Sequence, residues 1–242
     1  MSQDSEIENE MMARGLWAEK FVEFQSDREN PRRVAFARVG NATRRVIDRL
    51  VATMASNEEL GSIASEIEGV ATALERYPMG RTYEGFAEAA NAGSPGGFFD
   101  HSPVSGVANP IAPPLQFEIP DVDASGERRI LGRANFGSAY EGPPGCVHGG
   151  YLAAAFDELL GRAQSLGGNP GMTANLSINY RKPTPLKCDL EFEGVLWKID
   201  GRKVYTRGTC RYDGIVTAEA DALFVSINFE KLAELARLQR RL

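Results

Sequence analysis

Two hydrophobic patterns divide the chain into a helical N-terminal part and a C-terminal part rich in strands. Apolar residues recur every three or four positions between 41 and 77, which predicts two helices, the second beginning at a cap at Asn57 and ending before Pro78. From residue 172 onward, apolar and polar residues alternate. This period of two predicts four strands, within "MTANLSINYR", "LKCDLEFEGVLWKI", "KVYTRGTCRY" and "VTAEADALFVSIN".

A further helix is predicted over 148–166, and it begins in "GCVHGGYLAAAFDELL". The segment is apolar on most sides, so it must be buried on most sides, and the alanines 153–155 let neighbouring strands approach closely. Short strand candidates at 115–120 and 128–136 precede it. One long helix followed by consecutive antiparallel strands predicts an α+β fold in which a curved sheet wraps round the central helix.

Changes in composition suggest five consecutive regions. We expect a partly disordered N-terminal segment, a helical extension, a Gly/Pro-rich connector without periodicity, the α+β domain and a C-terminal helix. The connector is long for a structureless loop, which makes it either a linker or a functional loop. The boundaries are 1–40, 41–77, 78–114, 115–229 and 230–242.

Composition and charge narrow the function classes. The net charge of −6 argues against nucleic acid as the main partner. No stretch is long and apolar enough for a membrane span, and the acidic beginning "MSQDSEIENE" has no apolar signal region. The three scattered cysteines predict neither a disulfide framework nor a zinc site. We therefore expect a cytoplasmic protein without a metal centre.

Three collinear stretches of the C-terminal half are similar to a known family. They are "GPPGCVHGGYLAAAFDELLG", "MTANLSINYRKPTPL" and "GRKVYTRGTCRYDGIVTAEADALFV". Residues 115–229 resemble the hotdog-fold acyl-CoA thioesterases of the phenylacetic-acid-degradation type, in the branch that includes the human thioesterase superfamily members 4 and 5. The resemblance implies a hotdog fold, an acyl-CoA substrate, no cofactor and a homodimer or dimer of dimers whose strands pair edge to edge. It covers about half of the chain, and the first 110 residues show no family signal.

The resemblance also implies a catalytic site. A backbone N–H at Gly149 or Gly150 would face the thioester carbonyl oxygen. Asp157 would activate water or attack and Thr173 would assist, and both would act across a dimer interface. Chemistry supports these roles, since the first turn of a helix has unpaired N–H groups and partial positive charge, and a buried aspartate needs partners or a function. We expect the ring of His148 to brace the loop rather than to act as an acid or base.

Other polar residues extend this site. Asn175, two residues after Thr173 on an expected strand, should point to the same face and is a second polar candidate. Some relatives carry an amide in the loop before the His-Gly-Gly, whereas this chain has "YEGPPG" with Glu141.

Cations are expected where the phosphates of CoA would bind. Arg181 and Lys182 follow a strand, and Arg202 and Lys203 lie in the turn "DGRK". The resemblance places both regions near the CoA phosphates and pantetheine, although solvated turn charges would explain each pair equally well.

Three alternatives stay open. Asp100, His101 and Ser102 suggest a triad, but neighbours in sequence do not form one by adjacency, and we expect this segment to be a lid or acyl-pocket loop. A non-enzymatic acyl-CoA-binding regulator would use a basic N-terminal region to contact DNA, with arginines at 32, 33, 38, 44, 45 and 49. A hotdog hydratase or dehydratase would need a histidine and an acid facing the acyl chain in a different motif.

Overall fold

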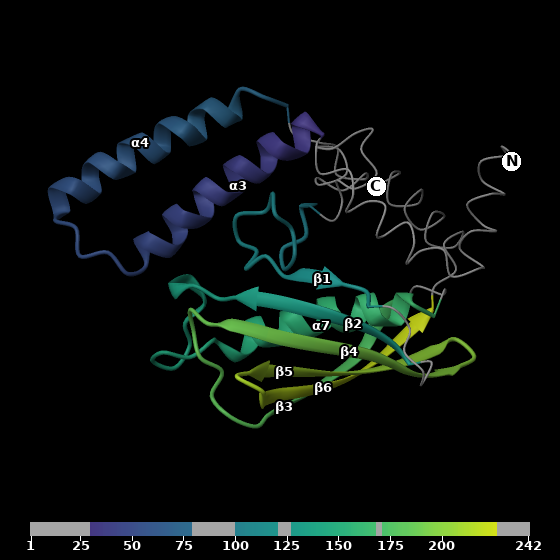
Figure 1. The fold of residues 1–242 in the computed structure, drawn as a ribbon. Helices are drawn as coiled ribbons and strands as arrows, with labels where there is room; N and C mark the ends of the chain where they lie inside the picture. The colour runs from purple at the N-terminus through teal and green to yellow at the C-terminus, as the bar shows by residue number, and fades with distance from the viewer. Residues whose placement is uncertain (1–29, 79–99, 121–126, 168–170, 227–242) are drawn as a thin grey trace, which may run out of the picture.

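The computed structural model describes residues 30–78, 100–120, 127–167 and 171–226. Two N-terminal helices precede a sheet that holds a third helix (Figure 1). The elements are α3 (Pro31–Leu50), α4 (Asn57–Glu75), β1 (Gln116–Glu118), β2 (Arg128–Asn135), the short 3-10 helix η2 (Ser138–Tyr140), α7 (Gly149–Ser165), β3 (Gly171–Tyr180), β4 (Asp189–Asp200), β5 (Lys203–Tyr212) and β6 (Ile215–Ser226).

The six strands form one antiparallel sheet in the order β1-β2-β4-β5-β6-β3. The sheet curves round α7 (Figure 1), and seven residues of α7 are buried against it. The expected fold class, a curved antiparallel sheet wrapped round a central helix with a helical N-terminal extension, is confirmed. Because β3 follows α7 but pairs with β6, one edge of β3 is left without a neighbouring strand in the described sheet.

Close contact between α7 and the sheet depends on small residues on both sides. Ala155 is completely buried on the helix. On the sheet, Gly194 of β4 lies directly opposite Gly208 of β5. A Cβ atom added at either position would approach Leu159 of α7 to 3.0–3.4 Å, closer than most side chains pack. The alanines were expected from the sequence, whereas the sheet glycines were not.

Helix α3 begins at Pro31, ten residues earlier than the sequence pattern suggested. The side chain of Asn30 caps it by accepting hydrogen bonds from the N–H groups of Arg32 and Arg33, and Pro31 occupies the first helical position. The expected boundary at residue 40 is therefore wrong. The analysis based on apolar spacing missed the first turns of this helix, in which Arg32 and Arg33 directly follow Pro31.

The described end of the connector, residues 100–114, packs on α3 instead of linking two separate parts. Asp100 forms a buried ion pair with Arg33, with Nε and Oδ2 2.6 Å apart. Arg44 donates hydrogen bonds to the carbonyl oxygens of Val107, Asn109 and Ala112. These bonds make α3 and residues 100–114 parts of one packed unit, which a linker between two separate parts would not form.

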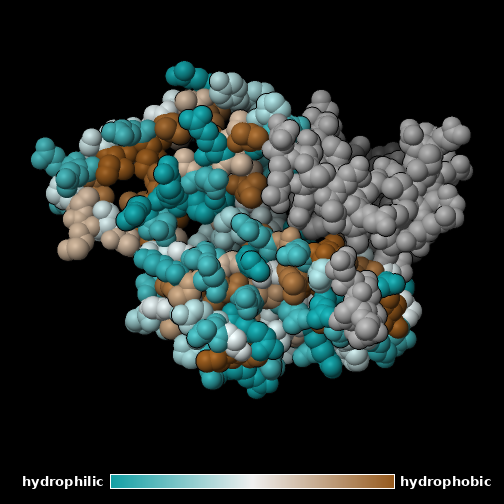
Figure 2. Space-filling view, in the orientation of Figure 1, coloured by the Kyte–Doolittle hydropathy of each residue, from teal (hydrophilic) through white to brown (hydrophobic). Residues whose placement is uncertain are grey.

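Helix α4 has no buried residue. Its N-cap is Ser56, one residue before the expected cap, and Ser56 and Glu59 form a reciprocal capping box. In the space-filling view, apolar side chains gather along and between α3 and α4 (Figure 2). The disorder expected for the first residues and the helix expected over 230–242 lie outside the described residues.

Candidate active site

The His-Gly-Gly stretch forms the N-terminus of α7, with His148 as its cap. The Nδ1 atom of His148 accepts a hydrogen bond of 3.0 Å from the N–H of Gly150. An accepting Nδ1 carries no proton, so this hydrogen bond requires the neutral ring with its proton on Nε2. The ring thus acts as a brace, and it occupies one of the two N–H groups that the sequence offered for carbonyl binding.

Gly149 is the other candidate, and its N–H has no hydrogen-bond partner among the described residues. It is the first residue of α7, where the helix carries partial positive charge. The hydroxyl group of Tyr180, at the end of β3, donates a 2.8 Å hydrogen bond to the carbonyl oxygen of Gly149. Tyr180 was not identified from the sequence, although it lies within the second motif, because only the fold brings it to the start of α7.

Asp157 and Thr173 come together where the middle of α7 faces the beginning of β3. The hydroxyl of Thr173 donates a 2.7 Å hydrogen bond to Oδ1 of Asp157. Both residues are exposed in the single chain, which differs from the expectation that Asp157 is buried. Asp157 points toward the open β3 side of the sheet, so its exposure depends on what pairs with that edge.

The structure does not bring Gly149 and Asp157 of one chain together. Eight residues of α7 separate them, which corresponds to about 12 Å along a helix axis. A thioester carbonyl and its attacking oxygen are within bonding distance of each other, so one chain alone does not supply both groups to one substrate.

Asn175 does not share a face with Thr173, and the sequence-based expectation is wrong. On β6, Thr173 pairs with Phe224 and Asn175 with the next residue, Leu223, so a β-bulge lies between them. Phe224 belongs to the buried core, and adjacent positions on β6 point to opposite faces. Thr173 therefore faces α7, whereas Asn175 faces outward and is not a polar partner of Asp157.

The two pairs of expected cations lie at opposite ends of the sheet. Arg181 and Lys182 line a pocket of about 420 Å³ together with Gly149 and Tyr180. The guanidinium group of Arg181 is paired with Glu219 at 2.8 Å. Arg202 donates hydrogen bonds to the carbonyl oxygen of Ser226, beside the beginning of β3.

Lys203 begins β5 at the same end of the sheet as Arg202. Because β3 is ten residues long, roughly 33 Å separates this end from Arg181. Only the Arg181–Lys182 pair is therefore near the start of α7 within one chain.

Glu141 closes the loop before α7. Its Oε1 atom accepts a 2.7 Å hydrogen bond from the N–H of Gly145, which has a positive φ of 72°. Glu141 thus stabilises the turn "EGPPG", and this loop presents no amide side chain toward the start of α7.

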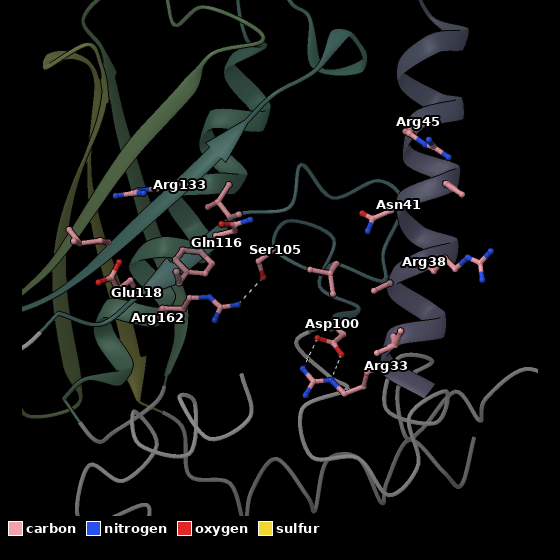
Figure 3. Close-up of a pocket in the computed structure, with 17 residues that line it drawn as sticks. Arg33, Arg38, Asn41, Arg45, Asp100, Ser105, Gln116, Glu118, Arg133 and Arg162 are labelled. Carbon is pink, nitrogen blue, oxygen red and sulfur yellow. Dashed lines mark hydrogen bonds and ion pairs between the residues drawn. The ribbon is translucent and has the colours of Figure 1, made fainter. Parts of the chain in front are cut away.

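A larger cleft of about 990 Å³ lies between α3 and β1 (Figure 3). Asp100 of the suggested triad lines it, but none of the residues expected for thioester hydrolysis or CoA binding does. On its walls, Arg38 and Arg133 point away from each other. Arg162 is held by Glu158 at 2.6 Å and lies over the ring of Phe117. Arg33 and Arg162 of this cleft are thus paired with carboxylates of the same chain, and the cleft is separate from Gly149, Asp157 and Thr173.

The residues 100–102 do not form a triad. The carboxylate of Asp100 binds Arg33, the ring of His101 packs edge-on against Phe36, and the Ser102 hydroxyl accepts hydrogen bonds from backbone N–H groups. These contacts confirm the expectation that the three neighbouring residues do not form a catalytic triad.

Some of the arginines of α3 are engaged by other groups within the molecule. Arg33 is buried in its ion pair and Arg44 is bound to loop carbonyls, while Arg32 stacks on Phe36. Three of the six arginines invoked for DNA contact are therefore engaged within the chain, which weakens the regulator alternative.

Within the described ranges, no cluster of His, Cys, Asp and Glu is suited to hold a metal ion. Among the helices of those ranges, none is long and apolar enough to cross a membrane.

Comparisons with known proteins agree with this architecture. The sequence profile of the thioesterase superfamily matches residues 144–218, which include α7 and the strands that follow it. Acyl-coenzyme A thioesterase THEM4 of Xenopus laevis is 38% identical over 103 residues, 42% of this chain and 46% of the relative. Human acyl-coenzyme A thioesterase THEM5 is 32% identical over 97 residues, 39% of each chain. The chain thus spans less than half the length of these curated relatives.

A solved structure extends the likeness beyond the C-terminal half. The crystal structure of a thioesterase superfamily protein is 36% identical, with a TM-score of 0.64, and the match covers 78% of this chain and 94% of that one. This share is larger than residues 115–229 alone supply, so the likeness reaches into the N-terminal region, where no family signal was recognised from the sequence. The chain belongs to the thioesterase superfamily, and its sheet wrapped round α7 is a hotdog fold.

Proposed function

We propose that the protein is an acyl-CoA thioesterase that hydrolyses a fatty or aromatic acyl-CoA to the free acid and CoA. The observation that carries the proposal is the hydrogen bond between Thr173 and Asp157, together with the unpaired N–H at the start of the same helix. The names of the similar proteins THEM4 and THEM5 support the same chemistry. The reaction requires no resident metal or redox group.

The N–H of Gly149 is the group that we assign to the thioester carbonyl. When the carbonyl carbon is attacked, negative charge develops on its oxygen, and a helix N-terminus with an unpaired N–H stabilises that charge. Gly150 is excluded from this role as long as His148 accepts its N–H. Tyr180 holds the carbonyl of Gly149 and thereby orients the first peptide units of α7.

Asp157 supplies the nucleophile, directly or through water. In one route its carboxylate takes a proton from a water molecule, whose oxygen bonds to the carbonyl carbon. In the other, the carboxylate oxygen itself forms the bond and water later hydrolyses the anhydride. In both, the carbon–sulfur bond breaks and the thiolate of CoA takes up a proton. Thr173 orients the carboxylate by its hydrogen bond.

We further propose a homodimer that completes the site through the free edge of β3. Gly149 is held beside Tyr180, and Asp157 beside Thr173. If a second copy pairs antiparallel along this edge, centred between residues 176 and 177, Tyr180 of one chain lies opposite Thr173 of the partner subunit. The N–H and the carboxylate that stand about 12 Å apart in one helix then meet across the interface.

The same pairing brings the Arg181–Lys182 pair of one chain close to the Arg202–Lys203 pair of the other. Arg181 and Lys182 at the end of one β3 come next to the beginning of the other β3, where Arg202 and Lys203 lie. Together they would surround the entrance on the Gly149 side and bind the phosphates of CoA. We also propose a cytoplasmic, reducing location, which is supported by the absence of a disulfide among Cys146, Cys188 and Cys210.

Hydrolysis of a panel of short-, medium-, long-chain and aromatic acyl-CoAs tests the activity, with released thiol as the readout. Asp157→Asn should lower kcat by about 10²–10⁴-fold, the usual contribution of a general acid or base. Asp221→Asn is the matched control, because Asp221 is an exposed carboxylate paired with Arg207 on the outer face of the sheet. No hydrolysis of any acyl-CoA, or equal activity of both variants, would contradict the proposal.

Subunit complementation tests the shared site. Gly149→Pro removes the proposed donor at a helix position that tolerates proline, and Gly149→Ala is its control because the alanine keeps the N–H. Unfolding and refolding a mixture of the Gly149→Pro and Asp157→Asn chains should recover activity, since mixed dimers contain one intact site. Activity that stays at the level of the separate variants would show that each chain works alone.

A further inference from the structure

The helical hairpin formed by α3 and α4, here called the arm (residues 31–75), carries an apolar surface that the described chain does not cover. The apolar residues of α4 are spaced alternately by three and four positions, as in a helix that packs lengthwise on another helix. On α3, three exposed apolar residues seven and four positions apart form a second row on one face of the helix. We define these as the arm stripe: Val39, Val46 and Leu50 of α3, and Ile63, Ile67, Val70 and Leu74 of α4.

The arm stripe is exposed to an unusual degree. Its side chains keep between 40% and 61% of their accessible surface even though the two helices are joined in a hairpin. None of them belongs to the hydrophobic core, and Figure 2 shows apolar side chains along both helices. Rows of exposed apolar side chains of this kind on a folded chain mark an interaction site.

Helix α4 has features that make it depend on packing for its stability. In proteins, most of the stability of a helix comes from tertiary packing of its apolar face rather than from helix propensity. Gly61 and Gly69 lower the helix propensity of α4 relative to alanine, and β-branched residues such as Ile63 and Ile67 lower it further. The capping box at Ser56 offsets only part of this. Packing of the apolar face has to supply the remainder.

The charges of the arm identify the partner. Helix α4 has five glutamates and no lysine or arginine between Asn57 and Glu75, whereas α3 has six arginines and one aspartate. An acidic helix is repelled by anionic membranes and nucleic acids. Arg38, Arg45 and Arg49 on α3 of another copy are complementary to it, since the other three arginines of α3 are engaged within their own chain. An identical arm also offers the matching apolar stripe.

We propose that the arm is a second self-association surface, on which the arm stripe of one chain packs against the arm of a second copy. Two hairpins related by a two-fold axis form a four-helix arrangement in which acidic α4 lies beside basic α3 of the partner subunit. The arm lies beside β1, and β3 is at the opposite edge of the sheet (Figure 1). Arm pairing is thus independent of pairing through β3 and does not rest on the proposed function.

Contacts at both ends of α3 fix this helix of the arm to the rest of the chain. Asp48 accepts a hydrogen bond from the N–H of Ser138, close to the end of α3, and the ion pair of Arg33 with Asp100 fixes the beginning of the helix. The orientation of α3 is therefore set by the hotdog domain at both ends, so α3 itself gains little order when two arms meet.

Sedimentation velocity of the full chain measures the surface directly. Ile67→Glu places a charge in the middle of the arm stripe, whereas Ser65→Glu adds the same charge to the opposite face of α4. Ile67→Leu keeps the surface apolar. The wild type, Ser65→Glu and Ile67→Leu proteins should have twice the mass of Ile67→Glu at micromolar concentration. Loss of α4 helicity is expected in Ile67→Glu only, as read by circular dichroism.

An equal mass for the wild type and Ile67→Glu would overturn the proposal. If Ile67→Glu in addition lost binding to phosphatidylserine-containing vesicles, the arm stripe would be assigned to a lipid surface. Because the Asp157→Asn assay reads hydrolysis rather than mass, failure of arm pairing and failure of the thioesterase proposal are distinguishable.

Discussion

The hydroxyl group of Thr173 lies 2.7 Å from Oδ1 of Asp157 and donates a hydrogen bond to it, although 16 residues separate the two in sequence. This bond connects the middle of α7 to the beginning of β3. It depends on the β-bulge after Thr173, because the bulge allows Thr173 to face α7 while Asn175 faces outward. A carboxylate that serves as base or nucleophile must be held in one orientation, and this bond is the restraint that the chain provides.

Thr173→Val should lower kcat while Thr173→Ser should preserve it. Valine keeps the branched shape but removes the hydroxyl, and a hydrogen bond to a charged group contributes about 1.5–3 kcal/mol. The expected loss is therefore about 10- to 100-fold in kcat, with a smaller change in KM. Steady-state kinetics on the best acyl-CoA measure it. Equal kcat for the valine and serine variants would assign Thr173 to packing alone.

His148→Ala and His148→Asn should behave differently. Alanine removes the cap of α7 and lowers the free energy of unfolding by about 0.5–2 kcal/mol. Asparagine is a good N-cap and can accept the same kind of hydrogen bond. Thermal unfolding should therefore show a lower Tm for His148→Ala than for the wild type, whereas the Tm of His148→Asn should stay close to that of the wild type. An equal Tm for the two variants would mean that the cap contributes nothing to the stability of the fold.

His101 should make the fold less stable in mild acid. Burial lowers the pKa of His101 below its ordinary value of 6.5, because the charged ring loses water; Asp100 opposes this effect and Arg32 reinforces it. Its Nε2 is buried without a hydrogen-bond partner in the described part of the chain.

The sign of the effect follows from linkage. Since the pKa is lower in the folded state, the unfolded chain binds the proton first, and stability falls as pH drops below about 6.5. Urea unfolding at pH 7.5 and pH 5.5 measures the difference. His101→Phe retains an aromatic ring against Phe36 and should lose less stability over this range than the wild type. An equal loss would mean that other groups cause it.

Gly194→Ala should destabilise the fold, although alanine is a small residue. The added Cβ would lie 3.0 Å from Cγ of Leu159 and 3.2 Å from Ile130, so α7 would be pushed from the sheet. Overpacking of this kind costs about 1–3 kcal/mol. Gly61→Ala on α4 is the contrast, since its Cβ meets nothing within 4 Å. Thermal unfolding should show a lower Tm for Gly194→Ala only. An unchanged Tm would mean that the sheet yields to the added methyl group.

The spacing of apolar residues along the sequence predicted much of the fold. The buried helix after His148 and the four alternating strands were predicted correctly, because their apolar residues repeat at the intervals that the helix and the pleated strand impose. The beginning of α3 was missed, since its first turns contain charged residues whose function is to bind the loop at 100–112. Such contacts are made by residues distant in sequence, and no local pattern records them.

For the candidate site, the sequence by itself determined the chemistry-bearing residues: a helix that begins with His-Gly-Gly, a carboxylate nine positions later and a threonine on the next strand. Only the tertiary structure decided how they are used. It joined Thr173 to Asp157, engaged the N–H of Gly150 with His148, and turned Asn175 outward. The physical reason is that hydrogen bonds and strand register depend on where separate segments meet, whereas residue type and spacing specify only what each segment offers.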